Sequence, residues 1–260
     1  RDSGVRARIA ATPSNPVIIV SDNVSTPHFT ELTTGYWQHI LNADQAGKLE
    51  APWRHGYPAR LPDGRVLMLP IRQMANAPGR AVASLICNHA AFDVAETLGC
   101  MLADKLAPLQ PEVVIGLPTL GLTFAPIVAR HLGHSRYVPL GYSRKFWYDE
   151  ALSSPVQSLT SPRPGKHVYL DPNLLPLVRG KRVVLVDDTV STGSTLSAPW
   201  GLMESLGAEV LACGVVMRQS RRWEARLGPE RAARLIGVFD SPLLRAVDDG
   251  WIEDPKQADD

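Results

Sequence analysis

The chain alternates two kinds of apolar pattern between residues 113 and 217. Short apolar runs typical of buried strands lie at 113–116, 137–140, 183–186 and 210–217, and segments with apolar residues at helical spacing lie at 123–132 and 196–206. Strands that alternate with helices in this way predict an α/β fold with a mostly parallel sheet flanked by helices.

The N-terminal part of the chain has a different texture. Residues 1–84 are rich in proline and short apolar runs, and we interpret them as an accessory segment. Within this segment, residues 16–20 predict a short strand, and residues 60–72 predict a hairpin because an Asp-Gly turn separates two apolar runs. Residues 80–106 carry helix formers at helical spacing, interrupted at Gly99, and predict a helix.

Residues 141–182 form a long, polar, proline-containing insertion between two predicted core strands. Insertions of this length in compact domains are usually lids or disordered segments. We therefore expect a flexible loop at this position, within a core that extends from residue 85 to residue 220. Residues 221–260 are interpreted as a C-terminal tail.

Composition narrows the class of protein. With 260 residues, 45% of them hydrophobic, and a formal net charge of +1, the chain can bury one sizeable core and has no electrostatic reason to bind nucleic acid. No apolar stretch approaches the roughly 20 residues that a membrane span needs. Cys87, Cys100 and Cys213 are widely spaced and set in apolar segments, which predicts reduced, buried thiols in a cytosolic protein.

Residues 183–195 carry the clearest chemistry. The apolar strand at the start of this segment ends in Asp187 and Asp188, at the edge where open α/β sheets bind their ligands. Residues 189–195 are rich in hydroxyl groups and predict an anion cradle, in which Gly193 lets the backbone approach a phosphate closely. Two acids before a phosphate cradle suit a sugar phosphate, because carboxylates accept hydrogen bonds from ring hydroxyls.

Two common nucleotide-binding motifs are missing from the sequence. It has no G-x-x-x-x-G-K-[ST], and no G-x-G-x-x-G opens a helix. The alternative interpretation of the acid pair is that it only caps the next helix, which explains one acid but not the loop that follows.

The segment 183–195 resembles the phosphoribosyl pyrophosphate (PRPP) signature of the type I phosphoribosyltransferases, with Thr189 in place of the more common aliphatic residue. The resemblance covers residues 85–220 and is nearest to purine-specific members of the xanthine and adenine types. It implies the fold of that family, and transfer of ribose 5-phosphate from PRPP to a nitrogen of a purine-like nucleobase with release of pyrophosphate. It also implies that Asp187 and Asp188 bind the ribose hydroxyls. The implied phosphate loop consists of Thr189, Val190, Ser191, Thr192, Gly193, Ser194 and Thr195.

A second segment, residues 116–121, reads as a strand-to-helix turn whose backbone N–H groups can receive an anion. The family has its pyrophosphate loop at this position, which implies PRPP contacts from Pro118, Thr119, Leu120 and Gly121. Adenine-type members usually carry an acid and an arginine inside the loop, whereas this chain has Pro118 and Leu120. The resemblance therefore implies backbone contacts here rather than side-chain contacts.

Arg144 and Lys145 resemble the basic pair that purine-specific members present to pyrophosphate from the edge of their flexible loop. We assign both a catalytic role, Lys145 foremost. The alternative is a solvated basic pair beside locally packed aromatic residues. No proton-transfer base can be assigned, since Asp149, Glu150 and Asp171 are candidates only as acids in or beside the loop.

The resemblance also implies a hood over the base, a cation and an assembly. The family builds its hood from terminal segments, here residues 1–84 and 221–260, and Phe239 and Asp240 are candidates for contact with the base. PRPP carries several adjacent negative charges, so we expect Mg2+, held chiefly by the substrate and with no protein ligand assigned. We also expect a homodimer.

Two other functions stay open at this point. A regulator could keep the same fold as a PRPP sensor without transfer activity, although residues 1–80 show no basic helix-turn-helix pattern. The acceptor could also be a pyrimidine or a specialised heterocycle, because the segments that would contact the base match no pattern of known specificity.

Overall fold

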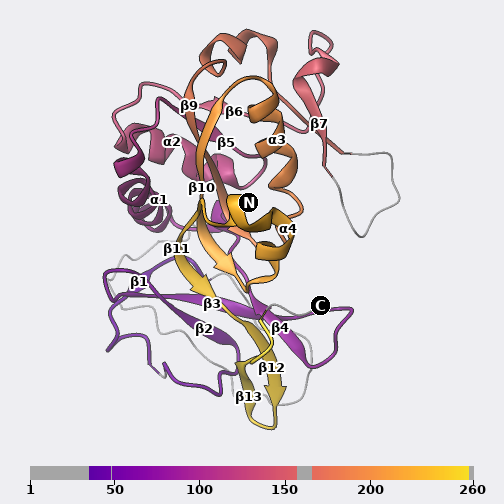
Figure 1. The fold of residues 1–260 in the computed structure, drawn as a ribbon. Coiled ribbons are helices and arrows are strands. Elements are labelled where there is room, and N and C mark those ends of the chain that lie inside the picture. The colour runs from indigo at the N-terminus through magenta and orange to yellow at the C-terminus, as the bar shows by residue number, and fades with distance from the viewer. Residues whose placement is uncertain (1–34, 48, 157–165, 258–260) are drawn as a thin grey trace, which may run out of the picture.

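The computed structural model describes residues 35–47, 49–156 and 166–257, which form two main sheets (Figure 1). The first is a five-stranded, all-parallel sheet in the order β11-β10-β9-β5-β6. Its strands are β5 (Val113–Gly116), β6 (Val138–Pro139), β9 (Arg182–Val190), β10 (Glu209–Gln219) and β11 (Leu235–Ser241). This sheet and its helices have the α/β architecture that the apolar pattern predicts.

The chain reverses its direction across the parallel sheet between β5 and β9. From β5 it passes through α2 (Gly121–His131) to β6 at one edge, and from β9 it passes through α3 (Ser197–Ser205) and α4 (Arg222–Ala232) toward β11 at the other edge. The C-terminal ends of β5 and β9 therefore lie side by side at a topological switch point. Open α/β sheets bind their ligands at such a point.

Side chains of the parallel strands alternate between two cores, one on each face of the sheet. Val184 and Val186 of β9 pack in the core that contains α1 (Phe92–Leu106) and α2, whereas Val183 and Leu185 pack in the core that contains α3. Helices thus cover both faces, which explains why these strands read as continuous apolar runs rather than alternating ones.

The second sheet is antiparallel and joins segments from both ends of the described chain. Its strands are β1 (Ile40–Leu41), β2 (Gly56–Arg60), β3 (Val66–Gln73), β4 (Arg80–Ala83), β12 (Leu243–Val247) and β13 (Gly250–Glu253). The link between the two ends is the pairing of β4 with β12. Leu67 and Leu69 of β3 pack in the same core as α1, so this sheet adjoins the α/β part without a break in the core (Figure 1).

A hairpin is present at the predicted Asp63-Gly64 turn, where β2 and β3 pair antiparallel. The predicted range of residues 60–72 is too short, because β2 begins at Gly56. The helix predicted for residues 80–106 is right only for its second part, since residues 80–83 form strand β4. Burial alternates along β4, with Ala81 and Ala83 buried, and pairing with two neighbouring strands outweighs the helix propensity of alanine.

The predicted interruption at Gly99 is wrong, because α1 continues through it. Ile127 of α2 packs against this glycine so closely that an added Cβ would lie 2.6 Å from its Cγ2 atom. Gly99 therefore allows close helix packing. The strand predicted for residues 16–20 lies outside the described residues.

The described part of residues 141–182 is more regular than the flexible loop that we expected. Strands β7 (Ser153–Pro155) and β8 (His167–Tyr169) pair antiparallel, and Gly141 forms an additional bridge with Tyr169. Residues 157–165, between the two strands, lie outside the described part. Two backbone hydrogen bonds between Gly141 and Tyr169 thus tie β8 of the insertion to the segment that follows β6.

Candidate active site

The two segments predicted to bind PRPP meet at the switch point of the parallel sheet. Gly116 of β5 is in register with Val186 of β9, and the backbone N–H of Leu117 donates to the Val186 carbonyl at 2.9 Å. The turn that follows Leu117 therefore runs alongside Asp187. The structure thus brings together residues that are about 70 positions apart in the sequence.

The acid pair lies inside β9 rather than after it, because the strand continues to Val190. Asp187 is in register with Val215, and Thr189 with Met217, of the neighbouring strand β10. The Val190 side chain is buried in the core, so any contact of Val190 with PRPP must come from its backbone. Parallel pairing thus holds the two acids more firmly than a loop would.

Burial and proximity raise the pKa of both acids. Asp187 is 7% exposed, and desolvation is the main cause that raises its pKa well above the usual value, with the charge of Asp188 adding to the effect. The pKa of Asp188 is also raised, chiefly by desolvation, while hydrogen bonds to its carboxyl oppose that shift. The Asp188 N–H donates to Asp187 Oδ1 at 2.9 Å. This pair favours ligands that donate hydrogen bonds or carry positive charge.

The turn of residues 118–121 packs directly on the acid pair. The Gly121 N–H donates to the Asp187 carboxyl, and an added Cβ on Gly121 would lie 2.6 Å from the Val186 carbonyl oxygen. Cys87 also contacts the turn, because its Sγ donates to the Leu120 carbonyl at 3.3 Å. Burial raises the pKa of this thiol to about 12, so it stays protonated and serves as a packing group.

The anion cradle follows β9 and leads into α3. Gly193 has φ of 76°, a conformation that favours glycine, and its carbonyl accepts from the Leu196 N–H at 3.2 Å. The hydroxyls of Thr192 and Ser194 lie 3.0 Å apart. A hydroxyl-lined turn before a helix N-terminus can offer donors to a phosphate, and phosphate binding by these residues stays a prediction.

Helix α4 also reaches the cradle, which the sequence analysis missed. The Arg222 Nη2 atom donates to Ser191 Oγ at 3.1 Å, and Trp223 packs against Gly193. Residues 220–222 follow the C-terminal end of β10, which is the neighbour of β9 in the sheet. The sequence signal that could have identified this contact is a basic residue, Arg222, just after the predicted strand that follows the PRPP signature.

The basic pair follows β6 and is exposed at the start of the insertion. The Arg144 guanidinium forms an ion pair with Glu150 at 2.5 Å, and Lys145 is exposed. Nearby, Tyr142 is half-buried, and its pKa is raised by desolvation and by the charge of Asp187, which places this tyrosine close to the acid pair. The structure thus brings Tyr142, at the start of the insertion, toward Asp187, while Arg144 and Lys145 are exposed.

The candidate base-binding residues are engaged in other contacts. Phe239 is 5% exposed and belongs to the hydrophobic core. Asp240 forms a two-pronged ion pair with Arg218, at 2.7 and 3.0 Å. A contact between these two residues and a base therefore stays a prediction that the structure does not support.

Metal-binding clusters, membrane-spanning helices and the burial of cysteines can be judged over the described residues as a whole. In the part of the chain that the structure describes, no three His, Cys, Asp or Glu side chains gather into a metal site, and no helix is long and apolar enough to cross a membrane. Cys87 and Cys213 are buried free thiols, whereas Cys100 is only partly buried, contrary to our expectation.

An acid pair with Asp187 buried, an anion cradle and a backbone turn at the switch point of a parallel sheet define an α/β protein built to bind a phosphorylated sugar. The chain belongs to the phosphoribosyl transferase domain family, whose model matches residues 86–234. This membership confirms the predicted resemblance, the fold and the enzyme class.

Relatives and solved structures agree with this assignment. The chain is 31% identical to adenine phosphoribosyltransferase 5 of Arabidopsis thaliana over 152 residues, which are 56% of this chain and 74% of that protein. It is 29% identical to orotate phosphoribosyltransferase of Sulfurisphaera tokodaii over 136 residues, which are 52% of this chain and only 58% of that protein. The structure of adenine phosphoribosyltransferase from Rhodothermus marinus, 18% identical, matches 66% of this chain and 93% of its own with a TM-score of 0.52, which shows a shared fold.

Proposed function

We propose that the protein transfers ribose 5-phosphate from PRPP to a nitrogen of a purine-like nucleobase and releases pyrophosphate. The observation that carries this proposal is the meeting of the acid pair, the cradle and the turn of residues 118–121 at one switch point. The Arabidopsis relative, whose name states adenine as the acceptor, supports a purine.

Each part of PRPP has a complementary group at this edge of the sheet. The ribose 2- and 3-hydroxyls donate to Asp187 and Asp188, and their hydrogen bonds favour the ionised forms of these carboxyls. The 5-phosphate accepts from the backbone and hydroxyl groups of residues 191–195. The pyrophosphate lies along the turn of residues 118–121, whose side chains carry no charge.

Catalysis on this view is mostly positioning and charge stabilisation. Positive charge develops on the ribose ring as pyrophosphate leaves, and the acid pair is held beside that ring. Lys145 supplies positive charge to the leaving group from the mouth of the site. Arg144 does so as well when it exchanges its partner Glu150 for pyrophosphate.

The acid pair also offers the type of ligand atom that a divalent cation prefers. Carboxylate oxygens are ligands that Mg2+ prefers, and a cation near Asp187 and Asp188 would favour their ionised forms despite burial. We propose that the site would take Mg2+ together with PRPP, whose oxygens would be its main ligands. When bound, it neutralises charge on the pyrophosphate. A homodimer and a cytosolic location stay predictions.

The test is an assay of pyrophosphate release from PRPP and Mg2+ with a panel of adenine, hypoxanthine, guanine, xanthine, uracil and orotate. We expect release with at least one purine. PRPP binding without release for any base would indicate the sensor instead, and release with orotate or uracil alone would indicate a pyrimidine acceptor.

A variant of Lys145 tests the assignment of the leaving-group charge. We expect Lys145→Ala to slow transfer at saturating PRPP by at least about tenfold while PRPP binding changes less, because the charge acts on the leaving group. The matched control is Lys105→Ala, at the C-terminal end of α1 and on the exposed surface. Equal rates for the two variants would return Lys145 to a solvated surface role.

A further inference from the structure

Arg222 reaches the anion cradle from a segment outside the PRPP signature. Its Nη2 atom donates to Ser191 Oγ at 3.1 Å, and its Nε atom lies 3.4 Å from Ser220 Oγ, to which it donates. Arg222 is partly buried, so its guanidinium is held among protein groups rather than free in solvent.

Packing fixes the first turn of α4 against the cradle. A Cβ placed on Gly193 would lie 3.2 Å from Leu227 and 3.3 Å from Trp223, so the part of α4 before Gly228 is in close contact with the cradle. The Trp223 Nε1 atom donates to the Ser220 carbonyl at 2.9 Å, which holds the chain just before Arg222. The position of the guanidinium therefore follows from the packing of its helix.

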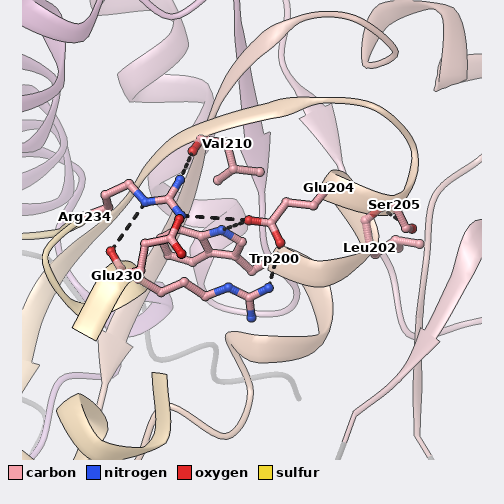
Figure 2. Close-up of polar contacts among 8 residues, drawn as sticks. Trp200, Leu202, Glu204, Ser205, Val210, Glu230 and Arg234 are labelled. Carbon is pink, nitrogen blue, oxygen red and sulfur yellow. Dashed lines mark hydrogen bonds and ion pairs between the residues drawn. The ribbon is translucent and has the colours of Figure 1, made fainter. Parts of the chain in front are cut away.

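Gly228, with φ of 76°, breaks α4 into two parts, and the part that follows it is anchored to α3 (Figure 2). Helix α3 begins just after the cradle. Glu204 of α3 accepts from Arg231 at 2.7 Å and from the buried indole of Trp200 at 2.8 Å. The Arg234 guanidinium lies over the Trp200 ring, at 5.2 Å from its centroid, and donates to the Val210 carbonyl at 2.7 Å. The cradle, α3 and α4 therefore form one connected unit.

The contact with Ser191 has a chemical consequence for an anion in the cradle. The Ser191 oxygen accepts from Arg222, which leaves the hydroxyl proton of Ser191 available to a second acceptor. Hydrogen bonds that involve a charged group are stronger than neutral ones. A serine that accepts from a guanidinium is thus a better donor to a phosphate than serine alone.

We propose that Arg222 is a positioning residue for the 5-phosphate of PRPP and acts through Ser191. This inference rests on the proposed function, because it takes the cradle to be the 5-phosphate site. The guanidinium orients and polarises the Ser191 hydroxyl and adds positive charge beside a cradle that otherwise offers neutral donors. Arg222 thus supports binding of the 5-phosphate of PRPP, which takes no part in the bond changes.

Separate binding of the two halves of the substrate tests this role. We expect Arg222→Gln to weaken ribose 5-phosphate binding, measured by calorimetry, by about 10- to 100-fold, as for the loss of a hydrogen bond to a charged group. Pyrophosphate affinity should change less than about twofold, since pyrophosphate lies at the other loop. Arg222→Lys should retain part of the affinity because it keeps the charge.

The matched control is Arg221→Gln, which removes the neighbouring guanidinium that pairs with Glu224 at 2.8 Å. We expect it to leave ribose 5-phosphate affinity unchanged. Raising the salt concentration should weaken ribose 5-phosphate binding more in the parent protein than in the Arg222→Gln variant. In a Ser191→Ala background, Arg222→Gln should have a smaller effect than in the parent, because the two residues act together.

Three results would overturn the inference. Equal ribose 5-phosphate affinity in the Arg221→Gln and Arg222→Gln variants would show that the contact has no role in binding. Equal losses of ribose 5-phosphate and pyrophosphate affinity, with a lower Tm, would show a purely structural role. If the parent protein itself binds no ribose 5-phosphate, the proposed function fails together with this inference. If the parent binds it and Arg222→Gln binds it equally well, only this inference fails.

Discussion

The tight packing of Gly121 against β9 predicts the effect of adding one methyl group at this position. Gly121 opens α2 and donates its N–H to the Asp187 carboxyl. In the Gly121→Ala variant, the added Cβ would lie 2.6 Å from the Val186 carbonyl oxygen and 2.8 Å from both the Asp187 Cα and Oδ1 atoms. All three distances are well below van der Waals contact, and two of the neighbours are backbone atoms of a central strand.

Relief of this overlap requires the turn of residues 118–121 to move away from β9. Overpacking of a tight site typically costs about 1–3 kcal/mol of unfolding free energy, and a fixed backbone on one side places this site toward the upper part of that range. The same movement separates the Gly121 N–H from Asp187. We therefore expect PRPP affinity to fall at least about tenfold, which corresponds to about 1.4 kcal/mol.

The assay combines urea unfolding with calorimetric titration of PRPP and Mg2+. The control is Gly201→Ala in α3, where the added Cβ lies 3.9 Å from Arg231 Nη2, with no closer neighbour. Because alanine favours helix more than glycine does, this control should gain about 0.5–1 kcal/mol of stability and bind PRPP normally. Normal stability and normal PRPP affinity of Gly121→Ala would refute the packing argument.

Two further predictions concern charge. Because burial raises the pKa of Asp187 in the folded state, its ionisation destabilises the fold increasingly as pH rises above about 4, the pKa in the unfolded chain. Asp187→Asn should therefore raise Tm at pH 8, less so toward pH 4, while PRPP binding is lost; a Tm gain independent of pH would contradict this. Glu204→Ala removes the acceptor of the buried Trp200 indole and of Arg231, and should cost about 1–3 kcal/mol in urea unfolding. Glu230→Ala, at an exposed ion pair with Arg234, should cost under about 1 kcal/mol, and equal losses would argue against the indole contact.

Local patterns in the sequence predicted much of the fold. The runs that became β5, β9 and β10 are β-branched and apolar because helices bury both of their faces, and this signal needs no knowledge of the partner elements. The pattern was misleading at residues 80–83, where alanines common in helices form a strand between β3 and β12. That pairing depends on a segment about 160 residues away in the sequence, so no local pattern contains it.

The sequence by itself determined the chemistry of the site: the two acids and the hydroxyl-rich cradle, with Gly193 inside it, are consecutive, and their order names the ligand class. Only the tertiary structure decided how this segment is completed. It placed Gly121 on Asp187 and Arg222 on Ser191, and it engaged Phe239 in the core and Asp240 with Arg218. The physical reason is that strand order in the sheet, rather than distance along the chain, determines which strand ends lie side by side.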